Sequence, residues 1–163
     1  MKKMLIATLA GLALILGACS SDKEEKSSPA TDQKQEQTTD HGGDIREETA
    51  SAEQLPAFMK SQPEDTQTIY LAVAKNRELL EQMPCYCGCG ESAGHKDNYD
   101  CFIHDNKKEA VVWDDHGTKC GVCLNIAADA INKLEQGMSV KDIRKAIDEQ
   151  YKDYPNPTPT PEV

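Results

Sequence analysis

The chain has 163 residues and a formal net charge of −10, and only two Phe and one Trp accompany its seven cysteines. Such an acidic surface repels nucleic acid, and the sequence has no basic stripe of the kind that holds phosphates, so nucleic-acid-binding classes are excluded. With so few large aromatic residues, six cysteines between residues 85 and 123 indicate sulfur chemistry rather than ordinary core packing. The carboxylates are dispersed and form no hydrolase machinery, so a role other than enzyme catalysis is expected.

The N-terminus predicts a lipoprotein signal. Lys2 and Lys3 form a basic region, and residues 5–16 form an apolar stretch that is short for a transmembrane helix. The following LGAC, which ends at Cys19, resembles a bacterial lipobox. In such signals residues 1–18 are removed and the new N-terminal cysteine carries a diacylglyceryl group and a fatty acid such as palmitate. We therefore expect the membrane to be a partner, through a lipid anchor on the extracytoplasmic face, although an uncleaved anchor or another cleavage site is the alternative.

Composition divides the remaining chain. Residues 19–54 are rich in Ser, Thr, Gln and charged residues, and they predict a disordered polar tether. Residues 155–163 predict a disordered Pro-rich tail, because proline neither continues a helix nor donates to a sheet. One small domain over residues 55–154 is therefore expected, at a size where cross-links or a metal add usefully to stability.

Apolar spacing within this domain predicts three helices. The first begins near Asp65 and ends before Pro84, which cannot continue it. The second covers residues 120–136 with Gly137 as its C-cap, and the third follows Ser139 as its N-cap.

Between the first two helices, residues 100–104 and 109–113 alternate in polarity and predict a short β-hairpin. The expected fold class is thus mainly α: a small domain of about three helices with a short β-hairpin and a Cys-rich loop.

The Cys-rich loop follows the first helix as PCYCGCG, residues 84–90. Its cysteines, Cys85, Cys87 and Cys89, occupy alternate positions, so in an extended segment their sulfurs leave the same face of the backbone. The adjacent glycines let the chain bend tightly around whatever the sulfurs hold. The remaining cysteines of the domain are Cys101, Cys120 and Cys123.

These residue types predict a site for a soft metal ion. Zn²⁺ prefers four thiolate or imidazole ligands in a tetrahedron, and Cu(I) takes a small number of thiolates, so zinc and copper(I) are both candidates. His95 lies midway between Cys89 and Cys101 and can add a nitrogen ligand, whereas His104 and His116 are expected at the surface. The candidate ligands are Cys85, Cys87, Cys89, Cys101, Cys120, Cys123 and His95.

Other uses of the same thiols stay open. Six cysteines in an exported domain can form a disulfide framework, which would make the domain a stapled interaction module without catalysis. Alternatively, the C-x-x-C pair of Cys120 and Cys123 opens a helix, where the helix N-terminus lowers a thiol pKa, as in thiol–disulfide redox proteins. The βαβ context of thioredoxin-like enzymes is missing, and iron–sulfur ligation suits an exported domain poorly.

The stretch MPCYCGCGESAGHKDNYDCFIH, with a lipobox upstream and C-x-x-C downstream, resembles the bacterial lipoprotein family named for its PCYCGC motif. The resemblance covers about residues 65–154. The residues that match the motif are Pro84, Cys85, Tyr86, Cys87, Gly88 and Cys89. The resemblance implies a lipoprotein of Gram-positive, Bacillus-like bacteria. No biochemical activity is established for the family, so the resemblance implies location and domain extent but neither a mechanism nor a protein partner.

Overall fold

The structure is a computed structural model that describes residues 37–39, 43–107 and 110–163. The predicted signal, Cys19 and most of the predicted tether lie outside the described residues. The described elements are β1 (Gln37–Thr39), β2 (Ile45–Thr49), the 3-10 helix η1 (Ala57–Ser61), α1 (Glu64–Lys75), α2 (Arg77–Leu80), α3 (Cys89–Ser92), the 3-10 helix η2 (Tyr99–Cys101), β3 (Ile103–Asn106), β4 (Val111–Asp114), α4 (His116–Lys119), α5 (Gly121–Glu135) and α6 (Val140–Gln150). None of these helices has the length and apolar character needed to cross a membrane.

The predicted hairpin is one half of a larger antiparallel sheet. Within the described residues the strand order is β1-β2-β4-β3, and each neighbouring pair is antiparallel. Strands β3 and β4 form the hairpin, with a register shift between Ile103 and Asp105. The first hairpin strand begins at Ile103 rather than at residue 100, because residues 99–101 are wound into η2.

Strand β2 comes from the segment predicted as a disordered tether. The structure includes residues 45–49 in the sheet, where they pair with β4, so the folded region begins before residue 55. The buried side chains of β2 are polar: Glu47 accepts a hydrogen bond from the Ala57 backbone, and Thr49 accepts one of 2.7 Å from Trp113 Nε1. Composition alone does not reveal this strand, because its buried side chains are polar and are satisfied by hydrogen-bond partners outside the strand.

The three predicted helices are present, with one interruption. The first is divided into α1 and α2 at Asn76, whose backbone leaves the helical region and whose side chain donates to the Ala72 carbonyl at 2.8 Å. Helices α5 and α6 confirm the second and third predictions. Gly137 follows α5 with a φ of +85°, and Ser139 accepts a hydrogen bond of 3.2 Å from the Asp142 backbone.

Helices α3 and α4, of four residues each, were not predicted, so the described residues contain six α-helices rather than about three. The coarser expectation of a mainly α domain with a β-hairpin is confirmed. Helices this short make too few internal hydrogen bonds to stand alone, and their positions depend on tertiary contacts.

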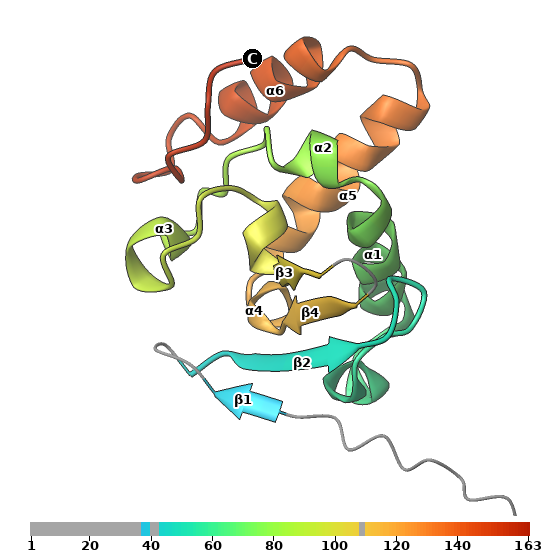
Figure 1. Ribbon diagram of the computed structural model, residues 1–163. Coiled ribbons are helices and arrows are strands. Elements are labelled where there is room, and N and C mark those ends of the chain that lie inside the picture. Colours follow the sequence, from blue (N-terminus) through green and yellow to red (C-terminus); the bar gives the residue numbers. More distant parts are fainter. Residues whose placement is uncertain (1–36, 40–42, 108–109) are drawn as a thin grey trace, which may run out of the picture. The chain divides into compact units, whose positions relative to one another are not determined.

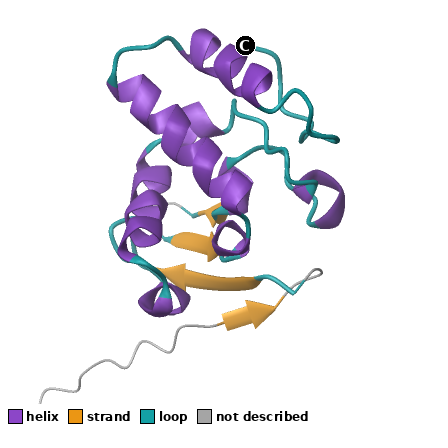
Figure 2. Ribbon diagram, turned by 180° about the vertical axis from the view of Figure 1, so that it is seen from behind, coloured by secondary structure: helices purple, strands orange, loops and turns teal. Residues whose placement is uncertain are grey.

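Helix α5 connects the parts of the core. It packs against α1, α2, α4 and α6. The sheet lies at its N-terminal end and α6 at its C-terminal end, as both ribbon views show (Figures 1 and 2). The side chains buried near the sheet include Tyr70, Phe102 and Trp113, and those between α5 and α6 include Ile126 and Ile147.

Gly117, in α4, marks the closest packing between this helix and the aromatic core. A Cβ atom at this position would lie 2.6 Å from two ring carbons of Phe102 and 2.9 Å from the Tyr70 hydroxyl oxygen. Both rings are fully buried and stack edge to face, with centroids 5.0 Å apart. Neither ring has open space to move into, so glycine is required by the close approach of α4.

We predict that Gly117→Ala lowers the free energy of unfolding by about 1–3 kcal/mol, because the added methyl group overpacks the core. The matched control is Gly121→Ala, at the start of α5, where a Cβ atom would meet nothing within 4 Å among the described residues. This control is expected to keep or raise the stability, by up to about 1 kcal/mol. Urea denaturation of both reduced, metal-free variants checks the prediction, and equal midpoints for the two would contradict it.

Candidate metal centre

The Cys-rich loop is held in place by the C-terminal tail. The Cys85 backbone N–H donates to Thr158 Oγ1 at 2.8 Å, and the Thr158 N–H donates to the Cys85 carbonyl at 2.9 Å. Thr158 is buried, although it lies in the segment predicted as a disordered tail. The tail therefore contributes to the site, because its polar atoms satisfy the backbone on both sides of the first cysteine of the motif.

A residue in the left-handed backbone conformation then turns the chain into α3. Gly88 has a φ of +85°, a conformation that glycine adopts without steric cost, and it precedes Cys89, the first residue of α3. The Cys89 carbonyl accepts a hydrogen bond of 3.3 Å from the His95 N–H, which brings the loop back toward the sulfurs. The tight bend that the glycines predict is thus present at Gly88.

Four thiols converge at the start of α5. The Sγ atoms of Cys85, Cys87, Cys89 and Cys123 all lie within 4.8 Å of one another. Cys85 Sγ is 3.1 Å from Cys123 Sγ, and Cys87 Sγ is 3.5 Å from each of them. All six cysteines in the described part of the chain are free thiols. Four sulfurs around a tetrahedral ion with bonds of about 2.3 Å are about 3.8 Å apart, so small movements would complete such a shell.

A second group of ligand atoms adjoins the first. Cys101, at the end of η2, is fully buried with its Sγ 3.6 Å from Cys89 Sγ. Cys89, His95 and Cys101 each offer a ligand atom within 4.8 Å of the other two. The structure thus brings five of the six predicted thiols and the predicted histidine into one continuous cluster, with Cys89 in both groups. We call these residues the thiol cluster: Cys85, Cys87, Cys89, Cys101, Cys123 and His95.

The His95 side chain is buried, and its ring nitrogens have no hydrogen-bond partner among the described residues. Only 5% of the residue is exposed, and both ring nitrogens, Nδ1 and Nε2, are buried. Burial lowers the pKa of His95, and the neighbouring His116 lowers it further, so the imidazole is neutral and keeps a lone pair for a metal. A buried imidazole without partners is costly unless a ligand engages it.

Two other predicted positions have different outcomes. Cys120 lies half-buried just before α5, and among the described residues it joins none of the possible ligand groups. The backbone of Cys120 is extended and ends helix α4, whereas Cys123 lies in the first turn of α5 and belongs to the cluster. His104 is exposed, as predicted.

The surface position predicted for His116 is wrong. Its ring is largely buried, with its centroid 4.7 Å from that of His95, and its Nδ1 lies 3.1 Å from Asp44 Oδ2. Hydrogen bonding to Cys87 and then to Asp44 raises the pKa of His116 to about 9, against the opposing effect of burial. A carboxylate that orients a histidine toward a ligand cluster is a common outer-shell arrangement in metal sites. No spacing pattern indicates this pair, because Asp44 adjoins the unpredicted strand β2.

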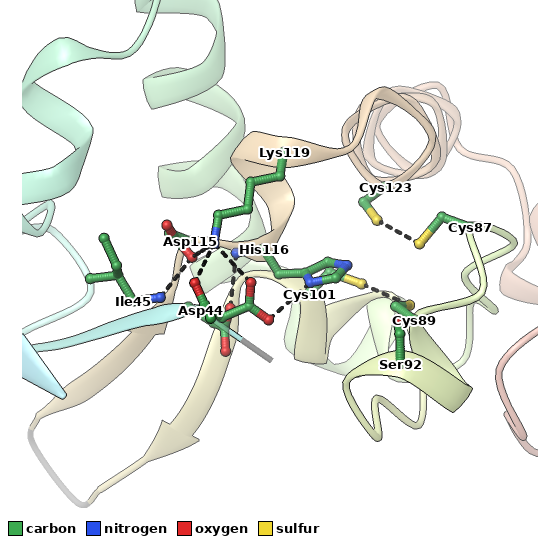
Figure 3. Close-up of polar contacts among 12 residues, drawn as sticks. Asp44, Ile45, Cys87, Cys89, Ser92, Cys101, Asp115, His116, Lys119 and Cys123 are labelled. Carbon is green, nitrogen blue, oxygen red and sulfur yellow. Dashed lines mark hydrogen bonds and ion pairs between the residues drawn. The ribbon is translucent and has the colours of Figure 1, made fainter. Parts of the chain in front are cut away.

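A polar network fixes Asp44 beside the cluster. Lys119 Nζ lies 2.9 Å from Asp44 Oδ1 and 2.7 Å from Asp115 Oδ1, and Asp115 also accepts a hydrogen bond of 2.8 Å from the Ile45 backbone. Figure 3 shows His116 between these carboxylates and the sulfur atoms. The carboxylates of Asp44, Asp114 and Asp115 also form a possible ligand group, but salt bridges to Lys119 and Arg46 already occupy them. We therefore assign this group a structural role.

The thiols of the cluster differ in acidity. A hydrogen bond from Cys123 lowers the pKa of Cys87 to about 4, whereas burial raises the pKa of Cys101 to about 12. Hydrogen bonds from Cys101, Cys123 and Cys87 lower the pKa of Cys85 further still, so negative charge is favoured at Cys85 and Cys87. A metal ion that replaced the thiol protons would bind at a site where at least one thiol is already deprotonated.

Comparison with known proteins identifies one family. The family model described as "Protein of unknown function with PCYCGC motif" matches residues 8–163. This range extends beyond the residues that carry the resemblance in the sequence analysis and includes both the tail and strand β2. No curated protein and no solved structure matches the chain.

We predict that Thr158→Val lowers the free energy of unfolding by about 1–3 kcal/mol, because the buried Cys85 N–H loses its acceptor while the side-chain shape is kept. The same change should speed the reaction of the Cys85 thiol with an alkylating reagent. Thr68→Val is the control, since the Thr68 hydroxyl bonds an exposed helix carbonyl, and its effect should stay within about 0.5 kcal/mol. Urea denaturation and mass spectrometry of the reduced proteins measure both quantities. An unchanged stability of Thr158→Val would show that the tail does not hold the loop.

Proposed function

The chain belongs to the family of proteins of unknown function with a PCYCGC motif, and we propose that it is a membrane-anchored lipoprotein that binds a soft metal ion. The observation that carries the proposal is the convergence of four thiols, Cys85, Cys87, Cys89 and Cys123, within 4.8 Å. Zinc and copper(I) are the ions that fit this donor set.

The chemistry of the donors selects the class of ion. Thiolate and imidazole are preferred by zinc and copper, whereas calcium, magnesium and manganese prefer oxygen. The carboxylates of Asp44 and Asp115 are already engaged by Lys119. Four sulfurs spaced for a tetrahedron favour Zn²⁺, and a subset of two or three would suit copper(I).

Three buried ligands and one half-buried ligand would let a bound ion exchange slowly with the surroundings. Cys85, Cys89 and Cys123 are at most 1% exposed, whereas Cys87 is half-buried. An ion bound here would be shielded from water on most sides and accessible from the side of Cys87. A receiving or delivering protein would therefore meet Cys87 first.

A thiol–disulfide redox protein is the second candidate, favoured by the distance of 3.1 Å between the sulfurs of Cys85 and Cys123. This short separation would pair Cys123 with the PCYCGC loop and not with Cys120, in contrast to the C-x-x-C chemistry that the sequence indicates. Oxidation of this pair would remove two metal ligands, so the two functions exclude each other in one molecule.

We predict that the full-length chain, purified without oxygen, contains zinc or copper in stoichiometric amount. The Cys87→Ser variant should bind this metal about 100-fold more weakly or worse, because a metal–thiolate bond is lost. Cys120→Ser is the matched control, being a half-buried thiol outside the ligand groups, and it should retain the metal. Elemental analysis, competition with a chromophoric chelator and proton release on binding provide the measurements. A metal-free native protein with a Cys85–Cys123 disulfide would instead support the redox candidate.

The membrane anchor is a separate part of the proposal, supported by the lipobox that ends at Cys19. We predict that in a Gram-positive host Cys19→Ala either accumulates as an uncleaved, unacylated precursor or is released into the medium, because no thiol remains to be acylated. Ser20→Ala should leave the protein in the membrane. Fractionation with mass spectrometry of the N-terminal peptide reads out both variants. An unmodified Cys19 in the membrane-bound protein would refute lipid anchoring.

A further inference from the structure

The thiol cluster contains more donors than one ion can use. A tetrahedral ion takes four ligands, and Cys85, Cys87, Cys89 and Cys123 supply all four. Cys101 and His95 are left over, although both are buried against the same sulfurs. Their position needs a reason other than the first ion.

Cys89 connects the two sets of donors. It belongs to the four-thiol group and also to the group formed with His95 and Cys101, and in each group the ligand atoms lie within 4.8 Å of one another. A thiolate sulfur carries more than one lone pair and can bind two soft ions at once. The geometry therefore offers two adjacent binding positions with one shared sulfur.

The unsatisfied ring of His95 is an independent sign of a missing ligand. Both ring nitrogens are buried, and neither has a partner among the residues described. Asp44 and His116 also offer ligand atoms within 4.8 Å of His95, but Asp44 already bonds His116 Nδ1 and Lys119. An ion beside Cys89 and Cys101 would satisfy one nitrogen of His95 and offset the cost of burying it.

Charge balance supports a second cation. Four thiolates around one divalent ion leave a net negative charge in a site with little solvent contact, and an ionised Cys101 would add to it. Buried charge of one sign is unfavourable unless it is compensated. Lys119 and Arg46 are already paired with Asp44 and Asp115 and with Asp114, respectively. His116, which bonds Cys87 and Asp44, supplies a single positive charge when protonated and offsets only part of this negative charge.

We propose that the thiol cluster binds two soft metal ions bridged by the Cys89 thiolate. One ion is held by Cys85, Cys87, Cys89 and Cys123, and the other by Cys89, Cys101 and His95. The proposal rests on the proposed metal-binding function and specifies its stoichiometry and ligand sharing.

The test uses the full-length chain with Cys19→Ser, which removes the seventh thiol, titrated with ¹¹³Cd²⁺ under reducing conditions. We expect two equivalents of cadmium to bind and two ¹¹³Cd resonances at different chemical shifts, because the two ions have different numbers of sulfur ligands. Scalar splitting between the two resonances would report the shared sulfur directly, since such coupling requires a bonded path through Cys89.

Matched variants assign the second position. Cys101→Ser and His95→Ala should each reduce binding to one equivalent and remove one resonance, while Cys120→Ser and His104→Ala retain two. Circular dichroism checks that each variant is folded. Because Cys101→Ser and His95→Ala lie at separate points of the chain, either variant still tests the second position if the other fails to fold.

The outcomes separate this proposal from the function on which it rests. One equivalent of cadmium with a single resonance would overturn the two-ion site and leave metal binding intact. Two resonances without splitting would overturn the Cys89 bridge. Absence of any bound cadmium would overturn both proposals together.

Discussion

The gathering of five sulfurs in one largely buried cluster is the constraint on which the rest of the domain depends. They arrive from three separate segments: the PCYCGC loop, the end of η2 and the first turn of α5. Thiols are weak hydrogen-bonding groups, so their mutual contacts add little stability by themselves. Clustered thiols become a strong cross-link only when an ion or covalent bond joins them, and metal binding would then contribute directly to folding.

The surrounding fold is arranged to hold these segments in register. The Asn98 side chain donates to the Cys123 carbonyl at 3.2 Å, and its backbone N–H donates to the Met83 carbonyl at 2.8 Å, so one buried residue joins the loop to α5. On the other side, Tyr70 donates to the Asp114 carbonyl at 2.9 Å and fixes the end of β4 next to His116. The sheet and α5 thus form the rigid support, and the short helices α3 and α4 position the ligands on it.

The sequence predicted the local elements well and the long-range assembly poorly. Helices α5 and α6 have regular apolar spacing and recognisable caps at Gly137 and Ser139, so their ends could be placed from neighbouring residues alone. Strand β2 could not be found, because its buried residues are polar and it joins the hairpin through β4, more than sixty residues away. For the same reason Thr158 and His116 were missed: each reaches the site through contacts that no spacing rule encodes.

The cysteines show the same division. The three sulfurs of the PCYCGC loop do lie together, but the left-handed turn at Gly88, rather than the alternation of an extended segment, brings Cys89 back toward Cys85 and Cys87. The C-x-x-C spacing suggested a pair that the fold separates into Cys123 inside the cluster and Cys120 outside it. X-ray absorption at the metal edge of the native full-length protein, purified without oxygen, is the most direct measurement of the central proposal. It should find a first shell dominated by sulfur at about 2.3 Å if zinc is bound. A shell of oxygen and nitrogen alone, or no metal edge at all, would contradict a thiolate metal centre.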